Sequence, residues 1–256
     1  MKHYKELLEM GCFTRNDVCM LLKNEDATHS LLYDYTRKGL IERVRRDLYV
    51  AISLETKQPV KSRYAIASKI SKSSYITHHS AFEYYGCANQ VYYEVYVGGE
   101  KYFSEFNYDD ITYRYVKPHI SDGIITDKNG VKVTDIERTV LDSIYNFEKI
   151  GGIEELLKCI EQIPSINEKK LLCYLKLYDC KFLYQKTGYI LEHFRNILNL
   201  SEKFFDECLS NIPLSKRYLY KTEYKNDLKL NLKWNLFVPE NLMFLISKGV
   251  NYNEYL

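Results

Sequence analysis

The chain has 256 residues, with 36 lysines and arginines against 34 aspartates and glutamates, so its formal net charge is only +2. This balance excludes a uniformly basic protein that coats nucleic acid, although local basic patches are compatible with it. Hydrophobic residues make up 46% of the chain and charged residues 27%. These values are typical of a folded globular protein and exclude a chain that is disordered throughout. The length favours one or two domains.

Seven cysteines are scattered along the chain, without a C-x-x-C pair or a Cys/His cluster at the spacing of a zinc site. We therefore expect free thiols in a reducing compartment, and no metal or other cofactor. The first ten residues contain no apolar run of signal-peptide length, and no segment approaches the roughly 18 apolar residues of a membrane span. These features predict a cytoplasmic protein that does not contact a membrane.

Three helices are predicted within the first forty residues. The first spans residues 3–10. The second begins after Thr14, which we expect to form a capping box with Asp17. The third is expected to begin at a Thr28 cap and to end at Gly39, since glycine is common just beyond the end of a helix.

A hairpin is predicted directly after these helices. Residues 40–45 and 48–52 are rich in β-forming side chains and are separated by Arg46-Asp47. Helices followed by a hairpin in this order are typical of a winged helix-turn-helix, which we assign to residues 1–54.

The third predicted helix has two different sides when its residues are spaced at 100°. The side expected to pack inward consists of Thr28, Leu31, Leu32 and Tyr35. The opposite, polar side consists of His29, Ser30, Tyr33 and Arg37. A recognition helix has this arrangement, because its apolar side holds it in place while polar side chains reach the base edges of DNA.

Positive charge is concentrated in the same region, since residues 28–46 contain five basic and two acidic side chains. The hairpin arginines are expected to meet the phosphate backbone or the minor groove. The other interpretation of this surface is a solvated face on a winged helix that binds protein. The residues predicted to contact DNA are Thr14, Arg15, Thr28, His29, Ser30, Tyr33, Arg37, Lys38, Arg43, Arg45 and Arg46.

The rest of the chain predicts a larger mixed α/β domain at residues 60–256, which follows a polar linker at 53–61 and makes the whole chain α+β. One helix is expected to start at a Thr134–Glu137 capping box. The other helices are expected at residues 61–70, 77–85, 153–163, 167–177 and 181–196, so that 151–200 is mostly helical. The strands are expected at residues 75–77, 91–97, 111–116 and 131–133, with two more within 216–238.

Several short motifs follow one another in the order found in a known family. They are Gly11–Asp17, Leu31–Val44, Asp47–Val50, Tyr75–Glu83 with Gly86, Val131–Asp142, Thr187–Glu192 and Trp234–Pro239. Together they cover most of the chain and resemble the AbiEi-family antitoxins, which belong to the AbiE abortive-infection toxin–antitoxin systems. The family usually has glycine where Asp47 stands, and aspartate tolerates the positive φ that such a turn requires.

The resemblance implies an antitoxin of a type IV toxin–antitoxin system, which acts in phage defence and is not an enzyme. In this family the N-terminal domain binds inverted repeats of double-stranded DNA in its own promoter and represses transcription, so two protomers are expected on one operator. The remaining domain counteracts a nucleotidyltransferase-like toxin without forming a stable complex with it.

Two other functions stay open. A stand-alone winged-helix regulator would have the same N-terminal domain and no toxin. A Mg²⁺-dependent nuclease would need an Asp and a Glu-x-Lys on neighbouring strands. The Glu-x-Lys spacing occurs at Glu223 and at Glu168, but Glu168 is expected at the start of a helix. His78-His79 is also expected at a helix start, where adjacent side chains diverge by about 100°, so we expect histidines of the core or surface rather than metal ligands.

Overall fold

Helices and sheets both contribute to the chain, which is consistent with the predicted α+β class. The computed structural model describes residues 2–220 and 228–248. The chain divides into two compact units, each of which collects segments that are separate in the sequence. The first unit consists of residues up to 76, 92–118 and 125–133, and the second of residues 77–91, 119–124 and 134 onward.

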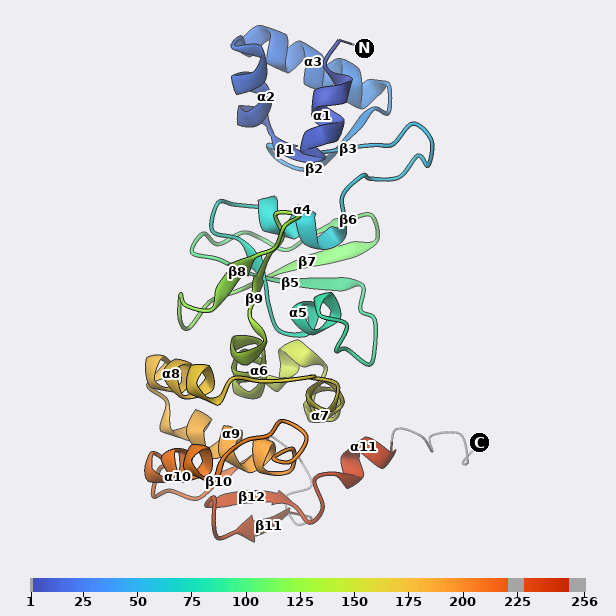
Figure 1. Cartoon of the computed structure of the whole chain (residues 1–256). Coiled ribbons are helices and arrows are strands. Elements are labelled where there is room, and N and C mark those ends of the chain that lie inside the picture. Colours follow the sequence, from blue (N-terminus) through green and yellow to red (C-terminus); the bar gives the residue numbers. More distant parts are fainter. Residues whose placement is uncertain (1, 221–227, 249–256) are drawn as a thin grey trace, which may run out of the picture. The chain divides into compact units, whose positions relative to one another are not determined.

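The N-terminal part of the first unit contains three helices and a small antiparallel sheet (Figure 1). The helices are α1 (Tyr4–Met10), α2 (Arg15–Leu22) and α3 (Glu25–Arg37), and the strands are β1 (Cys12–Thr14), β2 (Ile41–Arg45) and β3 (Leu48–Ala51). The strand order is β1-β3-β2. Buried Leu7, Phe13, Val18, Leu32 and Ile41 form the core of this part. The three helices and the hairpin therefore occur in the predicted order, although α3 begins earlier than predicted.

The ends of these elements show which local predictions were correct. Thr14 caps α2 and forms the expected capping box with Asp17. The prediction that Thr28 caps α3 is wrong, because Asn24 accepts a hydrogen bond from the Ala27 amide (2.9 Å) and the helix begins one turn earlier. Asp47 adopts the positive φ (61°) expected of the hairpin turn.

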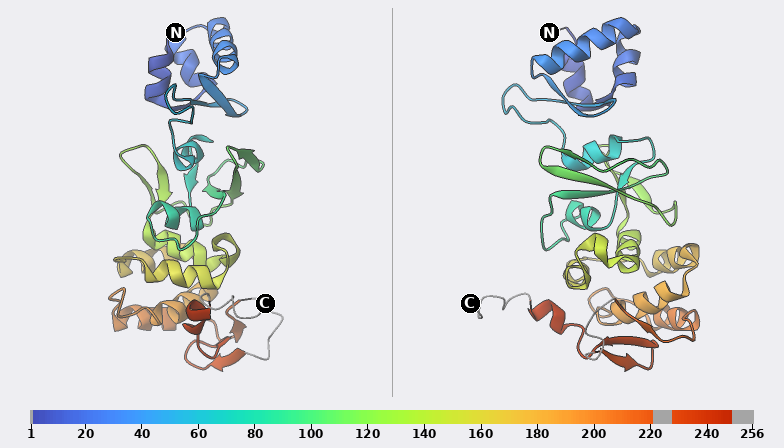
Figure 2. Two further views of the ribbon diagram at one scale, coloured as in Figure 1. Left: turned by 90° about the vertical axis from the view of Figure 1, so that its right-hand side faces the viewer. Right: turned by 180° about the vertical axis from the view of Figure 1, so that it is seen from behind.

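A six-stranded mixed sheet completes the first unit, in the order β6-β7-β5-β4-β9-β8 (Figure 2). Its strands are β4 (Tyr75–Ile76), β5 (Glu94–Gly98), β6 (Phe106–Tyr108), β7 (Ile111–Val116), β8 (Ile124–Thr126) and β9 (Lys132–Thr134). Strands β6 and β8 were not predicted, whereas the equally short β4 and β9 were. Helix α4 (Arg63–Lys69) packs on β4 and β5 of this sheet and on β1 of the N-terminal part.

The predicted linker at 53–61 contains no helix or named strand, but it is tied to the first unit. Ile52 forms an isolated bridge with Pro59, and the Val60 amide donates to the Ala51 carbonyl (3.0 Å). The Tyr108 hydroxyl donates to Glu42 (2.6 Å), which joins β6 to β2. The N-terminal part and the six-stranded sheet are therefore two parts of one compact unit.

The second unit is mostly helical, and α8, α9 and α10 lie side by side in it (Figures 1 and 2). Its helices are α5 (His79–Tyr84), α6 (Ile136–Tyr145), α7 (Ile153–Glu161), α8 (Glu168–Tyr178), α9 (Lys181–Glu192), α10 (Glu202–Ser210) and α11 (Phe244–Lys248), with a 3-10 turn, η1, at Phe147–Ile150. A small sheet in the order β10-β12-β11 contains β10 (Arg217–Tyr218), β11 (Leu228–Asn231) and β12 (Leu236–Pro239).

Two predictions in this unit need correction, and one helix was not predicted. Asp135, and not Thr134, caps α6, because its carboxylate accepts from the Arg138 amide (3.0 Å). The described part of 216–238 contains three strands instead of two, since β10 pairs with β12 in parallel. Helix α10 was not predicted, although Ser201 caps it and accepts from the Phe204 amide.

All seven cysteines are free thiols, as predicted. Within residues 2–220 and 228–248, no helix combines the length and the apolar character that crossing a bilayer requires.

Candidate nucleic-acid interface

The outer side of α3 exposes the four polar residues that the sequence predicts for it. His29, Ser30, Tyr33 and Arg37 are all exposed, and 62% of Tyr33 is accessible to solvent. On the inner side Thr28, Leu32 and Tyr35 are buried, as predicted, and Leu31 is half-buried against the same core. The apolar side holds α3 against the core, and the polar side offers donors, an acceptor and an aromatic ring at the surface.

Acidic residues limit how strongly α3 itself attracts phosphate. The helix carries Glu25, Asp26 and Asp34, and its one arginine is Arg37 in the last turn. Arg15 of α2 pairs with Glu25 (2.6 Å), so part of its charge is compensated. Phosphate attraction must therefore come mainly from the neighbouring hairpin.

The β2–β3 hairpin presents two of its three arginines to solvent. Arg43 is exposed, and the side chain of Arg46 is 88% accessible beside the turn. The register of β2 shifts between Arg43 and Arg45, which is typical of a β-bulge. Arg45 then lies over the rings of Phe103 and Phe106, with its guanidinium carbon 5.4 and 4.9 Å from their centroids.

The predicted contact residues therefore divide into two groups. Thr28 is fully buried and its hydroxyl donates to the Asn24 carbonyl (2.7 Å), so it is not available to DNA. Thr14 is occupied by its capping box, Arg15 is exposed but paired with Glu25, and Arg45 is partly buried against the two phenylalanines. We define the α3–hairpin face as His29, Ser30, Tyr33, Arg37, Lys38, Arg43 and Arg46, which are all exposed.

A pocket of about 370 Å³ lies beside the hairpin, within the first unit. It brings Lys69, at the end of α4, and Lys101, in the loop before β6, next to Arg46. Sequence analysis missed both lysines because they stand far from the hairpin in the chain and belong to no motif. They join the hairpin residues only in the folded chain, where α4 packs on β1 and the loop before β6 lines the same pocket.

Of the two Glu-x-Lys positions considered for a metal-dependent nuclease, the structure describes the one at Glu168. Glu223 lies outside the described residues. Glu168 is the first residue of α8, and its carboxylate accepts hydrogen bonds from the amide (2.9 Å) and the hydroxyl (3.1 Å) of Ser201. In the described part of the chain, no group of three or more His, Cys, Asp or Glu side chains is arranged to hold a metal ion.

His78 and His79 are core residues of the second unit. His79 is fully buried, with Nε2 3.4 Å from Glu155 Oε1 and Nδ1 3.9 Å from Glu83 Oε1. The Nδ1 atom of His78 is 3.1 Å from the Thr77 hydroxyl, which donates to Asp142 (2.9 Å). Both histidines therefore belong to buried polar networks that connect α5 to α6 and α7.

Lowering the pH is expected to destabilise the protein through His78. Burial lowers the pKa of His78 from 6.5 to about 4, against the opposing effect of Asp142. The imidazole of His78 binds a proton more readily in the unfolded chain than in the folded one. The stability that neutral His78 contributes is therefore present above pH 6.5 and is lost as the pH falls towards 4. We expect a loss of up to roughly 3 kcal/mol over this window.

Urea unfolding at several pH values measures this effect. The variant His78→Asn carries no titratable ring, and asparagine tolerates the positive φ (53°) of this position. Its free energy of unfolding should fall less steeply below pH 6.5 than that of the wild type. If the free energy of unfolding fell equally steeply with pH in the two proteins, the loss of stability could not be assigned to His78.

Comparison with known proteins assigns no family to the chain, and it finds similarity to a solved structure. No family model matches the chain, and no curated protein matches it. The crystal structure of the Rv2827c protein from Mycobacterium tuberculosis is similar, with a TM-score of 0.63 and 11% sequence identity over 93% of this chain and 89% of that chain. This likeness shows a shared fold over most of both chains and says nothing about activity.

Proposed function

We propose that this protein binds double-stranded DNA through an N-terminal winged helix-turn-helix at residues 1–54. The proposal rests on the observation that the outer side of α3 exposes His29, Ser30, Tyr33 and Arg37. A helix of this length fits the major groove, and the hairpin β2–β3 can then contact the backbone as the wing.

The two halves of the α3–hairpin face have different tasks in this proposal. Arg37 offers a guanidinium fork that matches the two acceptors of guanine, and Ser30 and His29 offer donors and acceptors for base edges. The acidic residues of α3 oppose nonspecific attraction to phosphate. Arg43 and Arg46 supply the cations that position the protein on the backbone without reading its sequence.

We further propose an antitoxin that represses its own operon and counteracts a nucleotidyltransferase-like toxin, as the resemblance to the AbiEi family implies. In this proposal two protomers bind the inverted repeats of one operator, the protein acts in the cytoplasm, and it catalyses no reaction. Co-expression with the product of the neighbouring gene tests the antitoxin role by cell survival. A repressor that binds its promoter but rescues cells from no such product would instead be a stand-alone regulator.

Replacing Arg37 with alanine is expected to weaken binding to the promoter of the protein's own gene by about 1–3 kcal/mol, with a smaller effect on unrelated DNA. The reason is the loss of a base contact, which only the specific complex makes. Fluorescence anisotropy with labelled promoter and scrambled duplexes at several salt concentrations measures both effects.

Two variants make this measurement specific. Arg46→Ala should weaken binding to both duplexes alike and should make the dependence of affinity on salt less steep, because it removes a phosphate contact. Arg195→Ala removes an arginine of the second unit that pairs with Glu202 and should leave both affinities unchanged. Unchanged binding by Arg37→Ala would reject α3 as the recognition helix.

A further inference from the structure

The pocket beside the hairpin has the composition of an anion-binding site. Its lining includes four cationic side chains, Arg45, Arg46, Lys69 and Lys101, against one carboxylate, Asp47. Asp47 lies 3.7 Å from Arg46 and compensates part of that charge. The hairpin pocket, defined by these residues with Tyr102, therefore has a positive balance in a chain that is nearly neutral.

Arg45 lines this pocket and carries a buried hydrogen-bond donor without a partner. Its guanidinium rests on Phe103 and Phe106, which fix its position. The Nη1 atom has no exposed surface and no hydrogen-bond partner among the residues that the structure describes. A buried charged donor without an acceptor costs free energy, so a ligand that supplies an acceptor would be stabilised here.

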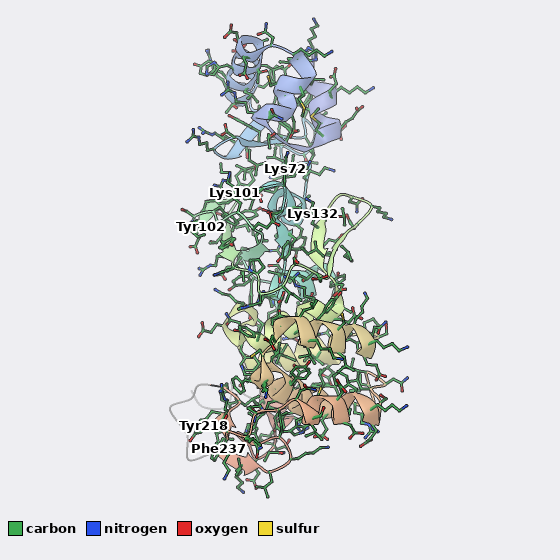
Figure 3. All side chains as sticks on the ribbon, turned by 90° about the vertical axis from the view of Figure 1, so that its left-hand side faces the viewer. Lys72, Lys101, Tyr102, Lys132, Tyr218 and Phe237 are labelled. Carbon is green, nitrogen blue, oxygen red and sulfur yellow. The ribbon has the colours of Figure 1, made fainter. Side chains whose placement is uncertain are left out.

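Tyr102 adds an aromatic surface to the same pocket. The residue is 69% exposed, and its ring meets Tyr115 edge to face, with centroids 5.2 Å apart. Figure 3 shows Lys101 and Tyr102 in neighbouring positions, with Tyr102 at the edge of the first unit. An exposed ring beside cationic side chains is the combination on which nucleobases stack while their phosphates are neutralised.

We propose that the hairpin pocket binds a small phosphate-bearing ligand of the nucleotide class. The phosphates would lie between Arg45, Lys69 and Lys101, and the base would stack on Tyr102. The volume of about 370 Å³ lies in the range of small-molecule sites. Arg45 is partly buried and lines the pocket. A small ligand can bring its phosphate into the pocket, whereas duplex DNA meets the protruding side chains first.

The proposal is tested by isothermal titration calorimetry of the full-length protein with ATP, GTP and inorganic phosphate. The double variant Lys69→Ala/Lys101→Ala should weaken binding of ATP or GTP by about tenfold or more, since each substitution removes a charged contact to the phosphates. Tyr102→Leu should weaken binding of the nucleotide by about fivefold or more, because stacking is lost, and should leave binding of inorganic phosphate unchanged.

A matched control removes two exposed lysines of the same unit that do not line the pocket. Lys117→Ala/Lys128→Ala loses the same charge and should change the affinity by less than about twofold. Absence of binding by the wild type, or equal losses in both double variants, would overturn the proposal.

Binding to duplex DNA shows whether the pocket takes the phosphate of a free nucleotide or that of the DNA backbone. If Lys69→Ala/Lys101→Ala weakens binding to duplex DNA while no nucleotide binds to the wild type, the pocket holds backbone phosphate and the nucleotide site is rejected. Nucleotide binding is measured without DNA, so the proposed DNA-binding function can fail while this inference stands.

Discussion

Replacing Asp142 with alanine is expected to lower the free energy of unfolding by about 3–5 kcal/mol, because it removes one partner of a buried ion pair. Arg138 and Asp142 lie one turn apart on α6, with 3.3 Å between Nε and Oδ2. Their side chains are only 1% and 5% exposed. The guanidinium would lose this carboxylate in a place where water cannot replace it.

Asp142 also connects α6 to other segments of the second unit. Its carboxylate accepts hydrogen bonds from the hydroxyls of Thr77 (2.9 Å) and Tyr178. Alanine would leave both hydroxyls without this acceptor. Asp142→Asn keeps an oxygen in the same place, so we expect it to cost less than alanine does.

Urea unfolding measures these differences, and an exposed pair provides the control. Lys229 and Glu240 are 2.6 Å apart, but 68% and 76% of their side chains are exposed. Glu240→Ala should therefore cost less than about 1 kcal/mol. If Asp142→Ala cost no more than Glu240→Ala, the buried pair would not have the stabilising role assigned to it here.

Replacing Trp234 with alanine is expected to cost about 3–5 kcal/mol, because it leaves a large cavity in the second unit. Trp234 is fully buried, and its Nε1 donates to Glu192 (2.7 Å) on α9. Its carbonyl accepts a hydrogen bond from Gln185 (2.6 Å) on the same helix. The indole is therefore fixed against α9 at both its ring and its backbone.

Gly188 of α9 is the position against which the indole packs. A Cβ atom at this glycine would lie 2.2 Å from two ring atoms of Trp234. We expect Gly188→Ala to cost about 1–3 kcal/mol, since overpacking outweighs the better helix propensity of alanine.

The double variant Gly188→Ala/Trp234→Ala tests this coupling. With the indole absent, the propensity gain of about 1 kcal/mol is no longer opposed, so Gly188→Ala should become neutral or stabilising. Thermal or urea unfolding of the four proteins in this cycle measures the change of sign. Additive losses would show that the contact between Gly188 and Trp234 does not limit the packing of α9.

Features that depend on neighbours in the sequence were predicted well. The capping box of Thr14 and Asp17 involves residues three positions apart, so its hydrogen bonds follow from the local chain alone. The positive φ of Asp47 is likewise a property of one residue in a turn. The start of α3 was predicted wrongly, because Thr28 and Asn24 are both residues that can cap a helix and it is Asn24 that begins α3.

Pairings between distant segments could not be predicted. The six-stranded sheet joins Ile76 to Val133 and β5 to β7, and several of its strands are only two or three residues long. Such strands carry too little periodicity to indicate their neighbours. Arg45 is a further example, because Phe103 and Phe106, about sixty residues later in the chain, draw it away from solvent.

The sequence by itself determined the helices of residues 4–37, the hairpin after them and the polar outer side of α3, because helical periodicity, caps and turn residues act over a few positions. Only the tertiary structure decided that Arg45 is recessed and that Lys69 and Lys101 join the hairpin in one pocket. The position of Arg45 and the grouping of these charges depend on packing between segments that are distant in the chain, and no local pattern encodes that packing.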